Sequence, residues 1–196
     1  MKLDRRAKYT RDTLKDSLIE LMKDQPIQKI TVKALCEKAD INRATFYGHY
    51  ENIESLLSEI ENDFYTSVND VFAGSTNIQY DIYSILVNIL NRIKQQSELC
   101  TVLVSPYGNK NFLESLLNMV YERAVVHMEQ RFPHAKRIQL ERTYGFFAHG
   151  SVNIIVNWIQ TGLVEPPEEI ATFIIGLMEE GLRSFRKTRF ENTAFR

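Results

Sequence analysis

The sequence predicts an all-α protein with two domains, for three reasons. Apolar residues repeat at helical spacing along most of the chain, and the five prolines fall between these repeats. No run of about four to eight residues alternates as a strand between hairpin turns would. Residues 1–50 hold 11 Lys and Arg against 7 Asp and Glu, a balance of +4, while residues 51–196 hold 13 against 18, a balance of −5. A basic head on an acidic body is typical of a polyanion-binding module joined to a different domain.

The individual helices are placed by apolar periodicity and by the residues that cap or stop them. The first is expected to follow Thr10 as its N-cap and to end near Asp24, because Pro26 cannot continue it. Two short helices should follow Thr31 and Asn42, since both are good N-cap residues. A fourth helix is expected near residues 52–73. Five more should follow it, near residues 78–96, 98–105, 110–131, 137–161 and 167–187.

The two short helices, Thr31–Ala39 and Asn42–His49, are separated only by Asp40-Ile41, which is the layout of a helix-turn-helix. In that motif the second helix enters the DNA major groove and reads base edges. A plain three-helix bundle is the alternative, because short capped helices with basic faces are common. Under the DNA-binding interpretation Phe46 and Tyr50 are the apolar anchors. The expected DNA contacts are Lys33, Asn42, Arg43, Ala44, Thr45, Tyr47, Gly48 and His49.

Residues 31–50 read T-V-K-A-L-C-E-K-A-D-I-N-R-A-T-F-Y-G-H-Y. This stretch resembles the DNA-binding domain of the TetR family of transcriptional regulators, and the resemblance extends over about residues 10–57. It implies a helix-turn-helix domain at residues 1–52 and a larger helical-bundle domain at residues 53–196 that binds an effector and dimerises. Three residues depart from the family pattern: Asp40 replaces a turn Gly, Gly48 removes a side chain that often contacts DNA, and Ile53 replaces a phosphate-binding Lys.

The C-terminal region resembles one group within this family, which includes an activator of a dihydroxyacetone kinase operon. The resemblance lies in residues 147–151, 158–162 and 166–171. It implies that the last two long helices form a four-helix dimer bundle with their copies. The stretch Tyr144–Ile159 is apolar on nearly every face, so it needs cover on all sides, either from a second subunit or from its own core. The expected interface residues are Ile154, Trp158, Ile174, Met178 and Leu182.

Polar and aromatic residues among the later helices are candidates for an effector pocket, with ordinary core or surface roles as the alternative. These are Tyr83, Met119, Tyr121, Tyr144, His149 and Asn153. The chain contains no Gly-rich phosphate loop, nucleophile elbow, CxxC pair or HExxH motif, so no enzyme, metal site or cofactor is expected. No apolar run approaches the ~20 residues of a membrane span. Cys36 and Cys100 fit a reducing interior, and a cytoplasmic location is expected.

The sequence therefore predicts a homodimer that binds a palindromic operator in double-stranded DNA. The resemblance further implies a small-molecule effector that shifts the spacing of the two heads, most commonly in a repressor. Two alternatives stay open. Gly48 and Ile53 motivate a coactivator that keeps the scaffold but acts mainly through a partner protein. A ligand-sensing helical bundle without a DNA role is the other, and the basic head argues against it.

Overall fold

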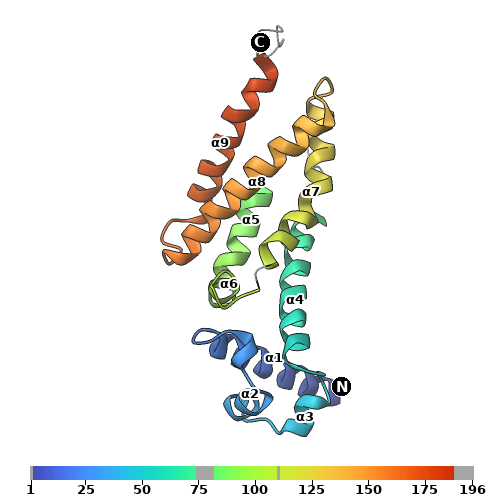
Figure 1. The fold of residues 1–196 in the computed structure, drawn as a ribbon, viewed down its shortest axis with the longest axis vertical. Helices are drawn as coiled ribbons and strands as arrows, with labels where there is room; N and C mark the ends of the chain where they lie inside the picture. The colour runs from blue at the N-terminus through green and yellow to red at the C-terminus, as the bar shows by residue number, and fades with distance from the viewer. Residues whose placement is uncertain (1, 74–81, 110, 188–196) are drawn as a thin grey trace. The chain divides into compact units, whose positions relative to one another are not determined.

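The computed structural model describes residues 2–73, 82–109 and 111–187, and every regular element in these ranges is helical (Figure 1). The expectation of an all-α fold is thus confirmed. The elements are α1 (Lys2–Met22), the 3₁₀ turn η1 (Ile27–Lys29), α2 (Val32–Ala39), α3 (Arg43–Tyr47), α4 (Ile53–Ala73), α5 (Ile82–Gln95), α6 (Ser97–Leu103), α7 (Phe112–Arg131), α8 (Arg137–Gln160) and α9 (Pro167–Lys187). No helix in the described ranges has the length and apolar character needed to cross a membrane.

Contacts divide the chain into two compact units, which are described separately. Unit 1 comprises residues 1–70 and 95–114, and unit 2 comprises residues 71–94 and 115–196. Unit 1 therefore includes α6 and most of α4 in addition to the three N-terminal helices. The domain boundary expected at residue 52 stays a prediction.

The first helix starts earlier than expected. α1 begins at Lys2, and Thr10 lies inside it rather than capping it. Residues 5–10 contain no Pro or Gly, and Arg, Lys and Ala are good helix formers, so nothing in this segment stops a helix. The buried apolar stripe begins only at Leu14. Apolar periodicity therefore locates the part of α1 that packs on the core and misses its exposed beginning.

The core of unit 1 forms where α1 packs against α2 and α6. Leu14, Leu18 and Met22 of α1 are buried there together with Leu35 of α2. Full burial of such side chains stabilises a fold by roughly 1.5–3 kcal/mol each. Figure 1 shows α1, α2 and α3 as one group. This packing holds the two short helices in a fixed arrangement.

The best-defined core of unit 2 joins α7, α8 and α9. Phe132, Leu140 and Leu182 are buried together, with Phe147 packed against them. α8 and α9 lie side by side (Figure 1). At the start of α8 the Arg137 guanidinium binds three carboxylates, those of Glu122, Glu129 and Glu141, at 3.3, 3.2 and 2.9 Å. These pairs are largely exposed, so they orient the α7–α8 junction more than they stabilise it.

Candidate DNA-binding surface

The N-caps of α2 and α3 are the two residues expected from sequence. The Thr31 hydroxyl accepts a hydrogen bond from the backbone N–H of Ala34 at 3.1 Å. The Asn42 side-chain oxygen accepts one from the N–H of Ala44 at 2.8 Å. Each cap satisfies a donor that the first turn of a helix leaves unpaired. Both helices therefore begin where their sequence specifies.

The turn between these helices survives without the glycine that is usual in the family. Asp40 adopts the left-handed conformation, with φ 53° and ψ 44°. The N–H of Ile41 then donates to the carbonyl of Cys36 at 3.0 Å, which closes the end of α2. Asp tolerates this conformation better than most residues because its side chain is short and polar. The backbone of the motif is thus intact at this departure.

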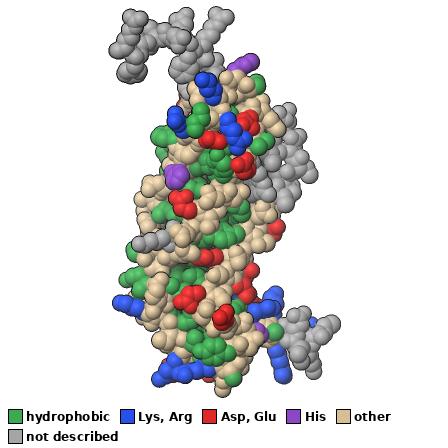
Figure 2. Space-filling model, turned by 45° about the vertical axis from the view of Figure 1, so that its right-hand side comes forward, with side chains coloured by type: hydrophobic (Ala, Val, Ile, Leu, Met, Phe, Trp, Pro, Cys, Tyr) green, Lys and Arg blue, Asp and Glu red, His purple; other side chains and the backbone are tan. Residues whose placement is uncertain are grey.

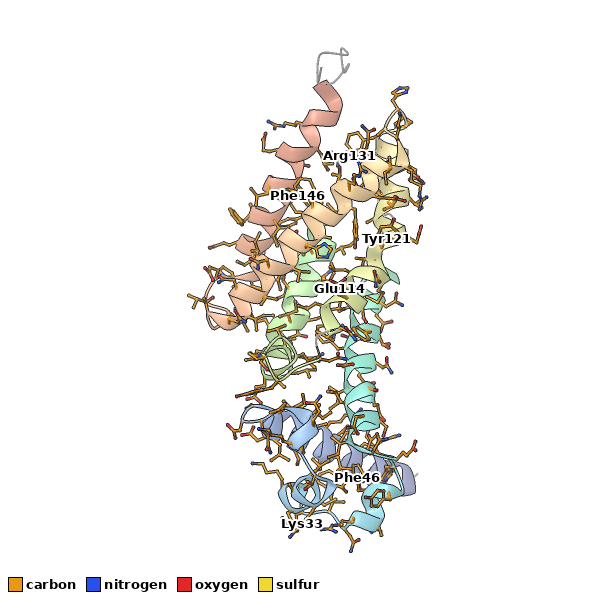
Figure 3. The ribbon with its side chains drawn as sticks, in the orientation of Figure 1. Lys33, Phe46, Glu114, Tyr121, Arg131 and Phe146 are labelled. Carbon is orange, nitrogen blue, oxygen red and sulfur yellow. The ribbon has the colours of Figure 1, made fainter. Side chains whose placement is uncertain are left out.

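Phe46 sets the rotation of α3 about its own axis. Its side chain is 0% exposed, and its ring lies 5.4 Å from the ring of Tyr47 and 5.9 Å from that of Tyr50 (Figure 3). Because α3 is short, one buried anchor fixes which side chains point outward. Tyr47 is 60% exposed as a result, which is unusual for a large aromatic side chain.

All the residues expected to contact DNA are exposed on α2, α3 and the turn that follows. They are Lys33, Asn42, Arg43, Ala44, Thr45, Tyr47, Gly48 and His49. In Figure 2, Lys and Arg side chains lie at several places over the part of the molecule formed by α1–α3, and others lie over unit 2. The surface thus combines cations, hydroxyl groups and an aromatic ring, which suit contacts to phosphates and base edges.

Two details at the end of the motif differ from expectation. α3 ends at Tyr47, so Gly48 is its C-cap rather than an interior residue, and His49 follows in the turn. Gly48 has φ −74°, a conformation open to any residue, so the turn does not require glycine. Ile53, at the start of α4, is only 5% exposed and acts as a core residue. Neither Gly48 nor Ile53 therefore offers a polar side chain to DNA.

The expected effector residues all lie in unit 2, but they are not gathered at one place. Tyr121 and Tyr144 meet between α7 and α8, with ring centroids 5.3 Å apart, and the Tyr144 hydroxyl donates to the Leu117 carbonyl at 2.7 Å. Burial raises the pKa of Tyr144 to about 12. His149 and Asn153 lie on an exposed face of α8. The two others differ in exposure: Tyr83 of α5 is exposed and Met119 of α7 is half-buried.

The residues expected at a dimer interface are partly used inside the single chain. Trp158, Ile174 and Leu182 are buried within it, and the Trp158 indole N–H donates to the Glu165 carbonyl at 3.0 Å. Ile154 and Met178 are half-buried. α8 carries apolar residues on nearly all its faces. The spacing of these residues therefore cannot show which side packs inside the chain and which side stays available to a second copy.

A different apolar face is exposed on α8 and α9, and sequence reasoning did not single it out as an interface. Phe146 is 76% exposed, and Phe173 and Leu177 are also exposed (Figure 3 labels Phe146). A Cβ built at Gly150 or Gly176 would meet nothing within 4 Å. The i, i+4 spacing of Phe173 and Leu177 is the signal that could have located this face.

Family comparisons agree with this geometry. Residues 16–60 match the model for bacterial regulatory proteins of the tetR family, and residues 80–180 match a transcriptional regulator C-terminal region. The chain is 24% identical over 178 residues to the HTH-type transcriptional regulator YxbF of Bacillus subtilis, covering 85% of this chain and 44% of that protein. It is 42% identical over 52 residues to the dhaKLM operon transcriptional activator DhaS of Lactococcus lactis, covering 26% and 28%. The matched regions span less than half the length of either relative.

Solved structures share the fold over nearly the whole chain. The dihydroxyacetone kinase operon activator DhaS superposes with a TM-score of 0.63 at 22% identity, covering 90% of this chain and 97% of that one. A TetR transcriptional regulator from Streptococcus agalactiae gives 0.64 at 20% identity, covering 91% and 98%. The C-terminal match alone spans more than half of the chain, and the N-terminal match contains the capped, exposed helix-turn-helix. The chain belongs to the TetR family of transcriptional regulators.

Proposed function

We propose that the chain is a homodimeric repressor that binds a palindromic operator and releases it when a small-molecule effector binds in unit 2. The observation that carries the proposal is the exposed surface of α2 and α3. Arg43, Thr45 and Tyr47 point away from a core that is anchored by Phe46. A helix presented in this way can enter a major groove without rearrangement of its own unit.

The exposed apolar face of α8 and α9 supports the dimer. Phe146, Phe173 and Leu177 are large side chains, and each would contribute roughly 1.5–3 kcal/mol if a second copy buried it fully. A two-fold symmetric dimer presents two recognition helices to half-sites about 34–36 Å apart. The operator of such a dimer is therefore palindromic.

The aromatic contact between α7 and α8 supports the effector part of the proposal. Tyr121 and Tyr144 place two phenol groups between α7 and α8 in unit 2. The hydrogen bond from Tyr144 to Leu117 fixes one of these rings, so a ligand would meet a pre-oriented group. An effector that binds better to one spacing of the recognition helices would shift the dimer away from DNA.

Selection of bound duplexes from a random DNA pool, with the purified protein alone, tests this function. We expect a palindrome of two half-sites. Arg43→Ala should weaken binding to it by about 5- to 150-fold, the equivalent of about 1–3 kcal/mol for a base-reading arginine. Tyr47→Ala should also weaken it, whereas Tyr107→Ala, which removes an exposed tyrosine of the loop after α6, should not. An enriched sequence that tolerates both α3 substitutions would contradict the proposed recognition surface.

Two observations favour a second candidate, a coactivator that needs a partner protein. A stretch of 52 residues is 42% identical to DhaS, which is described as an operon activator. In addition, Gly48 and the buried Ile53 leave fewer polar groups at the end of the recognition surface. If no sequence is enriched by the protein alone, and weak binding disappears at moderate salt, this candidate replaces the first.

A further inference from the structure

Four cations on the first turns of α1 have no role in the fold. Arg5, Arg6, Lys8 and Arg11 are all exposed, and no acidic residue lies between the first and the last of them. We call residues 5–11 the basic segment. None of its four cations forms an ion pair with any side chain that the structure describes. The segment also lies outside the family match, which begins at residue 16.

Later cations, Lys15 of α1 and Lys23 directly after it, are neutralised. The Lys15 ammonium binds Glu59 and Asp63 of α4, at 2.6 Å each. The Lys23 ammonium binds Glu20 at 2.8 Å. α1 therefore changes character along its length, from a free cationic part to a part whose charges are paired within unit 1.

Stability of the helix does not explain the basic segment. The positive end of the helix macrodipole lies at the N-terminus, so Arg5, in the first turn, disfavours the helix by roughly 0.3–1 kcal/mol, and the later cations of the segment lie beyond the reach of this effect. Packing does not explain it either, because no residue between Arg5 and Thr13 is buried. The apolar residues of α1 from Leu14 onward are committed to the core, so the segment has no apolar face for a membrane surface.

The basic segment lies beside the recognition helix, within the same unit. Burial raises the pKa of Tyr50, and the positive charge of Arg11 opposes this shift. The Tyr50 ring in turn lies 6.3 Å from that of His49, in the turn after α3. α1 packs against α2 and α2 against α3, and Figure 1 shows the three helices as one group. The segment thus extends from the edge of the proposed DNA-binding surface.

We propose that the basic segment binds phosphates of the DNA backbone that flank each operator half-site. The inference rests on the proposed function, because it takes DNA binding by α3 as given. A duplex seated on α3 continues past the motif, and free cations held on a helix next to it complement its phosphates. Such contacts raise affinity for every sequence and carry no base specificity.

Salt dependence of DNA binding tests the assignment, with Arg6→Gln/Lys8→Gln as the variant. It removes four cations from a dimer, and each phosphate contact contributes about 0.9 to the slope of log affinity against log salt. We expect the slope to fall by about three to four, on the selected operator and on an unrelated duplex alike. The matched control is Arg92→Gln/Lys94→Gln, which removes exposed cations of the same types from α5 and should leave the slope unchanged.

The possible outcomes separate this inference from the proposed function. If the wild-type protein binds the operator and the α1 variant keeps the full slope, the inference is overturned and the proposed function stands. If the wild-type protein binds no duplex at all, both are overturned. A fall seen on the operator but not on the unrelated duplex would also reject phosphate binding. The thermal midpoint of the variant should equal that of the wild type, since Arg6 and Lys8 are exposed and pair with no side chain that the structure describes.

Discussion

Glu61 of α4 has a buried carboxylate in which one oxygen accepts a hydrogen bond and the other does not. The side chain is 7% exposed, and its Oε2 accepts a hydrogen bond from the Asn109 amide at 3.1 Å. Its Oε1 is buried and has no hydrogen-bond partner among the described residues. Burial raises the pKa of Glu61, against the smaller opposing effect of the Asn109 hydrogen bond. We predict that Glu61→Gln stabilises the protein at neutral pH.

The size of the effect follows from the unpaired oxygen. A buried polar atom without a partner costs about 1–3 kcal/mol, and more if it carries charge. Glutamine removes the charge and keeps an oxygen that can accept from Asn109, while its amide group still needs a partner. We therefore expect a gain of about 1–2 kcal/mol near pH 7.

The same reasoning fixes the pH dependence. The pKa of Glu61 is higher in the folded state than in the unfolded state, so between the two values the folded protein binds more protons. Stability then falls as the pH rises from the unfolded pKa through the folded one, and the loss persists above it. The Glu61→Gln variant lacks this contribution, so its advantage should shrink on acidification toward 4.5, the ordinary pKa of a glutamate side chain.

Urea unfolding at a fixed protomer concentration, at about pH 5 and about pH 7.5, measures both effects. Glu179→Gln serves as the control, because it removes an exposed carboxylate of α9. If Glu61→Gln lowers the free energy of unfolding at the higher pH, the argument from the unpaired oxygen is refuted. An advantage that is identical at both pH values would refute the assignment of the effect to ionisation.

Two further substitutions test backbone features of unit 1. Asp40→Gly should raise the thermal midpoint modestly, because the left-handed strain of roughly 1 kcal/mol is removed at some cost in unfolded-chain entropy, and a lower midpoint would contradict the strain. Gly108→Ala should destabilise by about 1–3 kcal/mol, since its Cβ would come closer to the Leu103 backbone carbonyl than van der Waals contact allows. Gly145→Ala on α8, where a Cβ meets nothing within 4 Å, should instead be neutral or slightly stabilising, and equal thermal midpoints for the two alanine variants would count against this contrast.

Local chemistry made parts of this structure predictable. Thr31 and Asn42 were identifiable as N-caps because a cap acts on the residues two or three positions later and needs no tertiary partner. The turn at Asp40 was identifiable from the resemblance to the family, which has a turn Gly at this place, and Asp tolerates the left-handed conformation that the turn needs. The start of α1 was not, because residues 5–10 bury nothing and leave no apolar pattern.

The inner and outer sides of α8 could not be distinguished from sequence, for a different physical reason. Trp158 and Phe146 are both apolar residues of α8, yet one is buried within the chain and the other is 76% exposed. Which side of the helix faces inward depends on α7 and α9, and the sequence of α8 alone does not contain that information. A similar ambiguity affected the effector candidates, where only contacts between α7 and α8 distinguish Tyr144 from the exposed His149.

The two proposals about DNA concern different contacts: α3 reads bases, and the basic segment binds phosphates. Gly48 and Ile53 reduce the side chains that α3 and α4 can offer, which lowers the expected specificity and favours a partner-dependent regulator. Phosphate contacts from the basic segment would raise affinity for operator and unrelated DNA equally, so they cannot replace lost base contacts. A steep salt slope with a poorly defined operator would therefore mean that the protein binds DNA strongly but relies on a partner to choose the site. A steep slope with a well-defined palindrome would mean that Arg43, Thr45 and Tyr47 are sufficient to specify it.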